Sequence, residues 1–274
     1  LLTNSRIKNI QMQLEGNRAG FRTQAGTKLK NGQGETVYTP PQSIDLIEKY
    51  MANLEEFINN TEMCEVDPLI KMAIIHHQFE SIHPFYDGNG RTGRIVNVLY
   101  LVINGLLDLP ILYLSRYITK NKSEYYSLIQ SIRDKEGDNT IEWEKWILFI
   151  LKGVEQTAQD TIRLVQGISQ LMQKHKQILR PIFGKNYKHE LLNNIFYHPY
   201  TKIAFMERDL MVQRKTATKY LTMMVDAGIL THKKVGRENY YLNHELVTLF
   251  LNQDNAIRNK ENSIQSITDH LLKS

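Results

Sequence analysis

Apolar positions recur every three or four residues along much of this chain, which is the pattern of amphipathic helices. The windows that show this pattern span residues 43–58, 68–82, 122–134 and 141–153. Between residues 95 and 107 the apolar residues are dense on all sides, which predicts a buried central helix that ends at Gly105. The N-terminal part of the chain is therefore predicted to form a mainly helical domain.

One short stretch between residues 21 and 41 interrupts the helical pattern. Residues 27–30 and 35–38 are strand-like and flank Asn31-Gly32-Gln33-Gly34, which favours a tight turn. The pattern predicts a small β-hairpin, and its simplest interpretation is a surface hairpin with no further role.

The pattern changes again in the C-terminal part of the chain. Helical windows at residues 190–196, 203–210 and 214–227 precede strand-like runs at 229–234 and 239–243, which flank Val235-Gly236-Arg237-Glu238. This order resembles a winged helix-turn-helix, with Arg214, Lys215 and Lys219 near the start of a recognition helix. Residues 201–245 hold eight basic and five acidic residues, a balance of +3, which is mildly basic. DNA binding and a dimer or partner contact are equal alternatives for this domain.

These patterns divide the chain into four predicted segments. They are a helical domain at residues 1–153, a connecting helix at 154–187, a winged helix domain at 188–250 and a polar tail at 251–274. Pro181 is expected to end the connecting helix.

Composition places the chain among ordinary globular proteins. Of its 274 residues, 42% are hydrophobic and 23% are charged. No run approaches roughly 20 apolar residues and no signal peptide pattern opens the chain, so we expect no membrane partner. Cys64 is the single cysteine, which excludes an intramolecular disulfide and favours a cytoplasmic location. A net charge of +5 permits a polyanionic partner.

The twelve residues from His83 to Arg94 concentrate the chemistry of the chain. A histidine exchanges protons near neutral pH, and Asp87 is a hard oxygen ligand of the kind that Mg²⁺ accepts beside substrate phosphates. Gly88-Asn89-Gly90 can turn several N–H groups toward one anion, and the helix that follows adds its positive end. This combination indicates a phosphate-handling site.

The same run resembles the Fic family, whose signature is H-x-F-x-[D/E]-G-N-G-R-x-x-R. Every fixed position is filled by His83-Pro84-Phe85-Tyr86-Asp87-Gly88-Asn89-Gly90-Arg91-Thr92-Gly93-Arg94. A chance match is on the order of 10⁻¹⁰ per window. The resemblance extends over most of residues 1–150, through Gly20-Phe21-Arg22, Pro40-Pro41, His76-His77-Gln78-Phe79-Glu80 and Leu112-Tyr113-Leu114-Ser115. It implies the bacterial type of this family, a mainly α Fic core with a hairpin flap and a C-terminal winged helix domain.

The resemblance implies an enzyme, a nucleotidyltransferase that moves AMP from ATP to a Ser, Thr or Tyr hydroxyl of a target protein and releases pyrophosphate. His83 would be the catalytic base and Asp87 would hold Mg²⁺. Gly88, Asn89 and Gly90 would hold phosphate oxygens. The flap would pair its edge with a segment of the target.

The two arginines of the motif would brace the departing phosphates, with Arg94 at the γ-phosphate. Pro84 and Phe85 are expected to be structural, and Tyr86 is given no chemical role.

Three further residues leave alternatives open. Asn97, one turn past Arg94, could face the site or be hydrogen-bonded locally. Tyr125 and Tyr126 could offer an adenine platform, although aromatic residues in a helix are more often core. His76 and His77 lie near His83 in sequence, but neighbours on a helix point about 100° apart, so we expect no zinc site.

Many Fic proteins carry an inhibitory helix with the motif [S/T]-x-x-x-E-[G/N]. Glu15-Gly16 has the right ending, but Gln11 stands where a Ser or Thr belongs. The same offset holds Ile132, Lys234 and Ile257 for the three other Glu-Gly or Glu-Asn pairs. The expectation is an inhibitory element upstream of Leu1, one supplied by another subunit or an antitoxin-like protein, or none.

Three alternatives to AMP transfer belong to different classes. The domain could transfer another nucleotidyl or phosphate group, or it could sense nucleotide for a DNA-binding regulator, or it could be an idle scaffold. The complete motif argues against the scaffold. The expected partners are a target protein, DNA, an inhibitory partner and a second copy of the chain.

Overall fold

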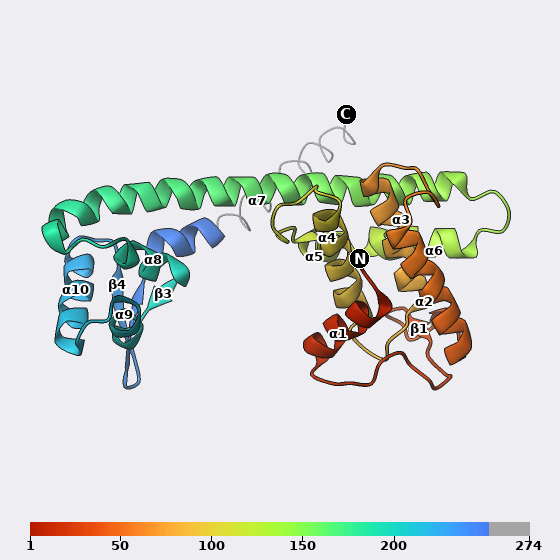
Figure 1. Cartoon of the computed structure of the whole chain (residues 1–274), viewed down its shortest axis with the longest axis horizontal. Helices are drawn as coiled ribbons and strands as arrows, with labels where there is room; N and C mark the ends of the chain where they lie inside the picture. The colour runs from red at the N-terminus through yellow and green to blue at the C-terminus, as the bar shows by residue number, and fades with distance from the viewer. Residues whose placement is uncertain (252–274) are drawn as a thin grey trace, which may run out of the picture. The chain divides into compact units, whose positions relative to one another are not determined.

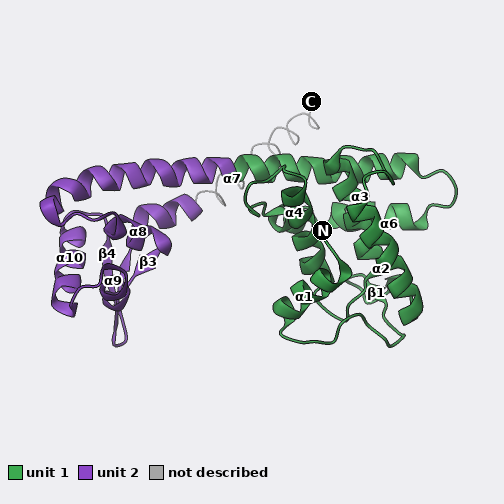
Figure 2. Ribbon diagram, in the orientation of Figure 1, with its two compact units in different colours: residues 1–161 green, residues 162–274 purple. Residues whose placement is uncertain are grey.

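The structure is a computed structural model that describes residues 1–251. It divides into two compact units, the first formed by Leu1–Thr161 and the second beginning at Ile162 (Figure 2). The predicted polar tail lies outside the described residues apart from Leu251. Within the described part, no helix has both the length and the apolar run needed to cross a membrane.

Unit 1 is a helical bundle around one core. Its helices are α1 (Asn4–Glu15), α2 (Ile44–Asn59), α3 (Pro68–Ile82), α4 (Asn89–Ile103), α5 (Leu114–Lys120), α6 (Lys122–Asp134) and the first part of α7 (Thr140–Phe183) (Figure 1). The core includes the fully buried Ile75, Phe79 and Trp146. The predicted mainly α class is confirmed, and α2, α3 and α6 lie within one residue of their predicted bounds.

The start and end of α3 are both fixed by its sequence. Asp67 accepts a hydrogen bond from the Leu69 amide at 2.8 Å, and Pro68 occupies the first turn, where its missing N–H costs nothing. The helix ends at His83, which takes a left-handed conformation with φ of 48°. The motif of residues 83–94 therefore starts at a sharp change of chain direction.

The predicted hairpin is present as β1 (Leu29–Lys30) and β2 (Thr36–Tyr38), which pair antiparallel. Its turn is built by Asn31, whose side-chain oxygen accepts from the amides of Gln33 and Glu35, each at 3.0 Å. Most residues of both strands are exposed.

The predicted break between a helix ending at Gly153 and a separate connecting helix is wrong, since α7 runs unbroken over 44 residues. Gly153 serves packing instead: a Cβ there would lie 2.6 Å from Cδ1 of Tyr117 on α5. Pro181 does not end the helix either, because α7 continues to Phe183 and passes into a 3-10 turn, η1 (Gly184–Asn186). A proline this close to the end removes only one of the last helical hydrogen bonds.

Unit 2 contains short helices and a small sheet. Its elements after α7 and η1 are α8 (His189–Tyr197), β3 (Tyr200–Thr201), α9 (Ile203–Leu210), α10 (Arg214–Asp226), β4 (Thr231–Val235) and β5 (Glu238–Leu242). The sheet has the order β3-β5-β4 and is antiparallel, with Thr231 opposite Leu242 and Val235 opposite Glu238. Leu191, Met206 and Leu221 lie fully buried in the hydrophobic core of this unit. The sequence did not predict β3, α1 or α5.

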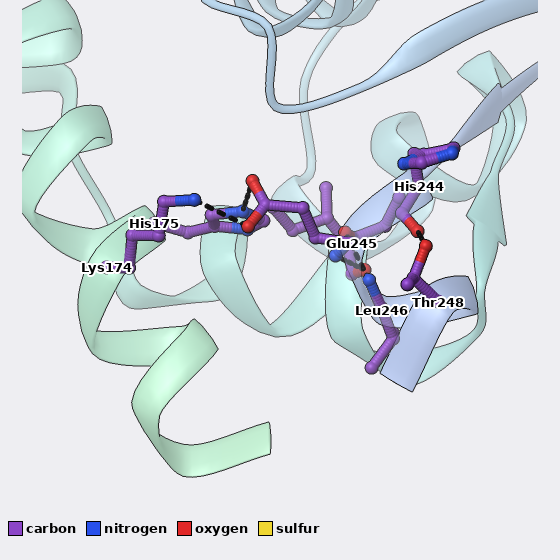
Figure 3. A network of polar contacts seen from close by, with 8 residues as sticks. Lys174, His175, His244, Glu245, Leu246 and Thr248 are labelled. Carbon is purple, nitrogen blue, oxygen red and sulfur yellow. Dashed lines mark hydrogen bonds and ion pairs between the residues drawn. The ribbon is translucent and has the colours of Figure 1, made fainter. Parts of the chain in front are cut away.

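A charged contact in unit 2 joins α7 to the helix that follows β5 and begins at residue 244 (Figure 3). Glu245 accepts from Lys174 at 2.5 Å and lies 3.5 Å from Nε2 of His175 (Figure 3). His175 is completely buried, which lowers its pKa, while the Glu245 carboxylate acts in the opposite direction. The contact fastens the last third of α7 to this helix.

Candidate active site

The loop between α3 and α4 is held by Arg22. This side chain is completely buried and donates from Nε to the carbonyl of His83 at 2.8 Å. Its Nη2 also donates to the carbonyl of Pro41, and its backbone N–H donates to that of Pro84 at 2.8 Å. A histidine with positive φ is uncommon and costs energy, so these bonds keep His83 in its left-handed conformation.

The centre of the loop is anchored by Phe85 and Asn89. Phe85 is fully buried between Phe21 and Phe79, with ring centroids 5.4 and 6.3 Å away. Asn89 accepts from the Phe85 amide at 2.9 Å and donates to the Phe85 carbonyl at 2.8 Å. The structural role predicted for Phe85 is confirmed, and the Asn89 side chain is already engaged. Only the backbone of Asn89 is left for a ligand.

The N-terminus of α4 forms an anion cradle. Gly88 is the N-cap with φ of 79°, and the first helical hydrogen bond runs from the Thr92 amide to the Gly88 carbonyl at 2.9 Å. The amides of Asn89, Gly90 and Arg91 consequently have no partner within the helix and face its open end. The exposed carboxylate of Asp87 lies beside them and accepts from the Gly88 amide at 2.7 Å.

Glu15, at the end of α1, covers this cradle. Its Oε1 accepts from Nη2 of Arg91 at 2.5 Å, and a Cβ built on Gly88 would lie 2.3 Å from the same oxygen. Gln11, one turn earlier, donates to the Asp87 carbonyl at 3.3 Å. Two residues of α1 thus rest on the motif loop. The inhibitory motif [S/T]-x-x-x-E-[G/N] did not identify this helix, because Gln11 stands where a Ser or Thr is expected.

Arg94 has different partners from Arg91. Its Nε donates to Oγ of Ser115 at 2.6 Å, and a Cβ on Gly90 would lie 3.0 Å from its Nη1. A Cβ on Gly93 would lie 3.1 Å from Oε1 of Glu80, so a buried carboxyl from α3 adjoins the first turns of α4. Burial raises the pKa of Glu80 to about 7, against the opposing charges of Arg94 and Arg133. The two motif arginines are therefore held independently.

His83 is set up to accept a proton. Burial lowers its pKa to about 4, and the positive charges of Arg22 and Arg133 act in the same direction. The ring is consequently neutral at physiological pH, the state that a general base requires.

The other histidines of this region belong to the core. His76 shares a 3.0 Å hydrogen bond with the Tyr125 hydroxyl, and Nε2 of His77 lies 3.2 Å from the Ile129 carbonyl. Tyr125 is buried, whereas Tyr126 is 57% exposed, so only Tyr126 is open to a ligand. Asn97 is buried, and neither of its amide atoms has a hydrogen-bond partner among the described residues. The local hydrogen bond considered for Asn97 is therefore not formed.

Four residues near the motif received no role from the sequence: Glu15, Arg22, Glu80 and Arg133. Arg22 and Glu80 lie in stretches that carry the family resemblance. Each is a charged residue among apolar neighbours, and this was the signal that could have indicated a role for it. Glu15 could have been found by allowing any residue at position 11. Arg133 had no such signal, because an exposed place on its helix was equally compatible with the pattern.

Two family models match parts of this chain. A family model described as Fic/DOC family matches residues 2–101, and a model described as protein adenylyltransferase SoFic-like, C-terminal domain, matches residues 171–246. A protein adenylyltransferase, fic-1, of Caenorhabditis elegans is 28% identical over 89 residues, which cover 32% of this chain and 16% of that protein. A probable protein adenylyltransferase of Aquifex aeolicus is 48% identical over 54 residues, 20% of this chain and 17% of that protein.

These matches span less than a fifth of either curated relative. A crystal structure of a Fic family protein from Desulfovibrio desulfuricans aligns with a TM-score of 0.49 at 19% identity, over 88% of this chain and 68% of that one. The complete motif of residues 83–94 lies inside the segment that the Fic/DOC model matches. This part of the chain is therefore similar to the Fic/DOC family.

Proposed function

We propose that this chain is a protein adenylyltransferase that transfers AMP from ATP to a Ser, Thr or Tyr hydroxyl of a target protein. The observation that carries the proposal is the placement of a neutral His83 directly before an anion cradle flanked by Arg91 and Arg94. The relatives named as protein adenylyltransferases support the same reaction.

The residues of the site can account for each bond and proton in the transfer. The target oxygen attacks the α-phosphorus, a P–O bond forms to it, and His83 takes its proton. The P–O bond to the β-phosphate breaks, and pyrophosphate leaves with the electron pair. Backbone amides of Asn89 and Gly90 would bind phosphate oxygens, and Arg91 and Arg94 would neutralise the leaving group.

Asp87 fits the Mg²⁺ proposed for this reaction. Mg²⁺ binds proteins through one or two carboxylates and takes its other ligands from water and substrate phosphates. The Asp87 carboxylate is exposed beside the cradle, and the Gly88 amide orients it at 2.7 Å. The ion would supply positive charge to the transferring phosphates.

The hairpin of β1 and β2 is proposed to receive the target. It is a short two-stranded sheet with exposed residues, and an extended segment could add to its edge through backbone hydrogen bonds. Such docking would hold a hydroxyl-bearing side chain in register for attack.

We propose that α1 restrains this activity. Glu15 neutralises Arg91 and lies against Gly88, so a triphosphate must displace the carboxylate to use the cradle. The inhibitory glutamate of the family pairs with the final motif arginine, whereas Glu15 pairs with the first, which is a departure from the family pattern. An inhibitory element from a partner protein or a second copy of this chain is the alternative source.

A second function is proposed for unit 2, as a winged helix domain that binds DNA. Arg214, Lys215 and Lys219 are exposed at the start of α10, and Lys233 and Lys234 are exposed on β4. Phosphate contacts from these residues would give an affinity that falls steeply with salt in a gel-shift titration. An affinity that ignores salt, or no shift, would favour a dimer or partner contact.

Label transfer from α-³²P-ATP with Mg²⁺ tests the main proposal. The protein is incubated alone and with host lysate, beside a His83→Ala control and a Glu15→Gln variant. A labelled band that needs His83 supports nucleotidyl transfer. If neither the wild-type protein nor Glu15→Gln transfers label, while both still bind ATP, the proposed function is overturned.

A further inference from the structure

The hairpin of β1 and β2 cannot stay ordered by its own contacts. Its strands are two and three residues long, and Lys30, Thr36 and Val37 are exposed. An isolated two-stranded hairpin is marginally stable at best in water. A docking edge that fixes a target hydroxyl must therefore be held from outside.

The holding contacts come from α6. Nε2 of Gln130 donates to the Val37 carbonyl at 2.9 Å and to Oδ1 of Asp134 at 2.6 Å, which orients the amide. One turn along, the guanidinium carbon of Arg133 lies 4.0 Å from the centroid of the Tyr38 ring. Both contacts act on β2, the second strand of the hairpin.

Arg133 also contacts α3, the helix that leads into the catalytic motif. Its Nε donates to Oγ of Ser81 at 3.0 Å, and Ser81 is buried two residues before His83. Its Nη2 is buried without a hydrogen-bond partner among the described residues. Burial lowers the pKa of Arg133, with Tyr38 and Glu80 opposing the shift. A partly buried guanidinium is retained here against a desolvation penalty, which indicates that its position matters.

We propose that Arg133 is a positioning residue that sets the distance between the hairpin and His83. Its planar face supports Tyr38 while its edge is fixed on Ser81, so the docking strand and the catalytic helix share one rigid spacer. A lysine carries the same charge but offers neither the flat face nor a donor at the Nε position. This inference rests on the proposed function, because only a docked target gives the spacer a substrate to align.

Hydrogen exchange tests the spacer without reference to catalysis. Arg133→Ala and Arg133→Lys should raise exchange of the amides of residues 29–38 by about tenfold, while α3 and α4 keep wild-type rates. Tyr38→Phe should keep wild-type exchange, because the ring remains, and Tyr38→Leu should match Arg133→Ala. Lys122→Ala, which removes a positive charge from the exposed start of α6, is the matched control. Unchanged exchange in Arg133→Ala, with unit 1 folded by circular dichroism, would overturn the proposal.

Kinetics then separate positioning from binding of nucleotide. The lysate protein that wild type labels most strongly is purified and used as substrate. Arg133→Lys should lower kcat/KM for that protein by about tenfold or more and leave the Kd for ATP within about twofold of wild type. Faster exchange with unchanged kcat/KM would also overturn the proposal. If neither wild type nor Glu15→Gln transfers label, the proposed function fails, and the exchange result alone still decides whether Arg133 holds the hairpin.

Discussion

Glu15 and Arg91 lie 76 positions apart in the sequence, and their side chains meet at 2.5 Å over the cradle at the start of α4. The Glu15 side chain is 12% exposed and that of Arg91 is 53% exposed, so the carboxylate is the more enclosed partner. A phosphate that enters the cradle competes for the same arginine. The helices α1 and α4 are therefore joined at the point where ATP is proposed to bind.

Removing the Glu15 charge should release the cradle. Glu15→Gln is expected to tighten ATP binding by about tenfold, because Arg91 loses its competing anion and a partly exposed charge pair has a modest energy. Isothermal titration with ATP and Mg²⁺ measures the effect. Glu48→Gln, which removes an exposed carboxylate from α2, should leave the affinity unchanged. Equal affinities in wild type and Glu15→Gln would show that α1 does not restrain the site.

Loss of Arg22 should destabilise unit 1. Arg22→Met leaves the carbonyls of His83 and Pro41 without this donor and removes the support of a strained residue, so the free energy of unfolding should fall by about 2–4 kcal/mol. Urea unfolding followed by circular dichroism measures it. Arg18→Met, at an exposed site nearby, should change stability by less than about 0.5 kcal/mol. A similar loss in both variants would contradict the role of Arg22.

The pH profile of transfer should reflect the depressed pKa of His83. The base works when neutral, and its pKa of about 4 keeps it neutral well below the ordinary value of 6.5. Activity should therefore persist as pH falls through 6.5, and the acidic limb of kcat/KM should lie near pH 4.

Label transfer in constant-ionic-strength buffers from pH 4 to 8 measures this profile, with circular dichroism at each pH to confirm that unit 1 stays folded. That check is needed because the buried His76 also has a lowered pKa, about 3, so the folded state loses stability as pH falls below 6.5. Half-maximal activity near pH 6.5 in a fully folded protein would contradict the assignment.

A methyl group at residue 153 should lower the stability of the protein. Gly153→Ala would place Cβ 2.6 Å from the Tyr117 ring, and the resulting shift of α5 against α7 should cost about 1–3 kcal/mol. Gly167→Ala in the same helix meets only the flexible end of Leu249 at 3.2 Å, so its helix propensity should make it neutral or slightly stabilising. Thermal unfolding compares the two variants, and an equal Tm for both would refute the packing role of Gly153.

The sequence predicted the parts of this fold that obey strong local rules. The helix at Pro68–Ile82 has a capping residue, a first-turn proline and a dense apolar stripe, and it matches its prediction at both ends. In α1 the core-facing residues are Ile7 and the polar Gln11, so no apolar period marks the helix. Gly153 and Pro181 were interpreted as breaks, because packing against Tyr117 and proximity to the helix end are tertiary facts that a sequence pattern does not contain.

The sequence likewise predicted only the part of the candidate site that lies in one contiguous stretch. The motif named His83 and the residues of the cradle, since their spacing is contiguous in the chain. The residues that position them, such as Arg22 and Arg133, come from segments 61 and 52 positions away from their partners. Contacts of that kind depend on how helices pack, and the pattern of residues along the chain does not determine this packing.

The engagement of Asn89 with Phe85 has a consequence for how this site can vary. Ligand contacts made by peptide groups are supplied by any amino acid, so the chemistry of recognition does not depend on the side chain at position 89. The side chain at position 89 instead determines where the peptide groups of the loop lie. A substitution there would move the whole turn, and affinity and turnover would decline together rather than one at the expense of the other.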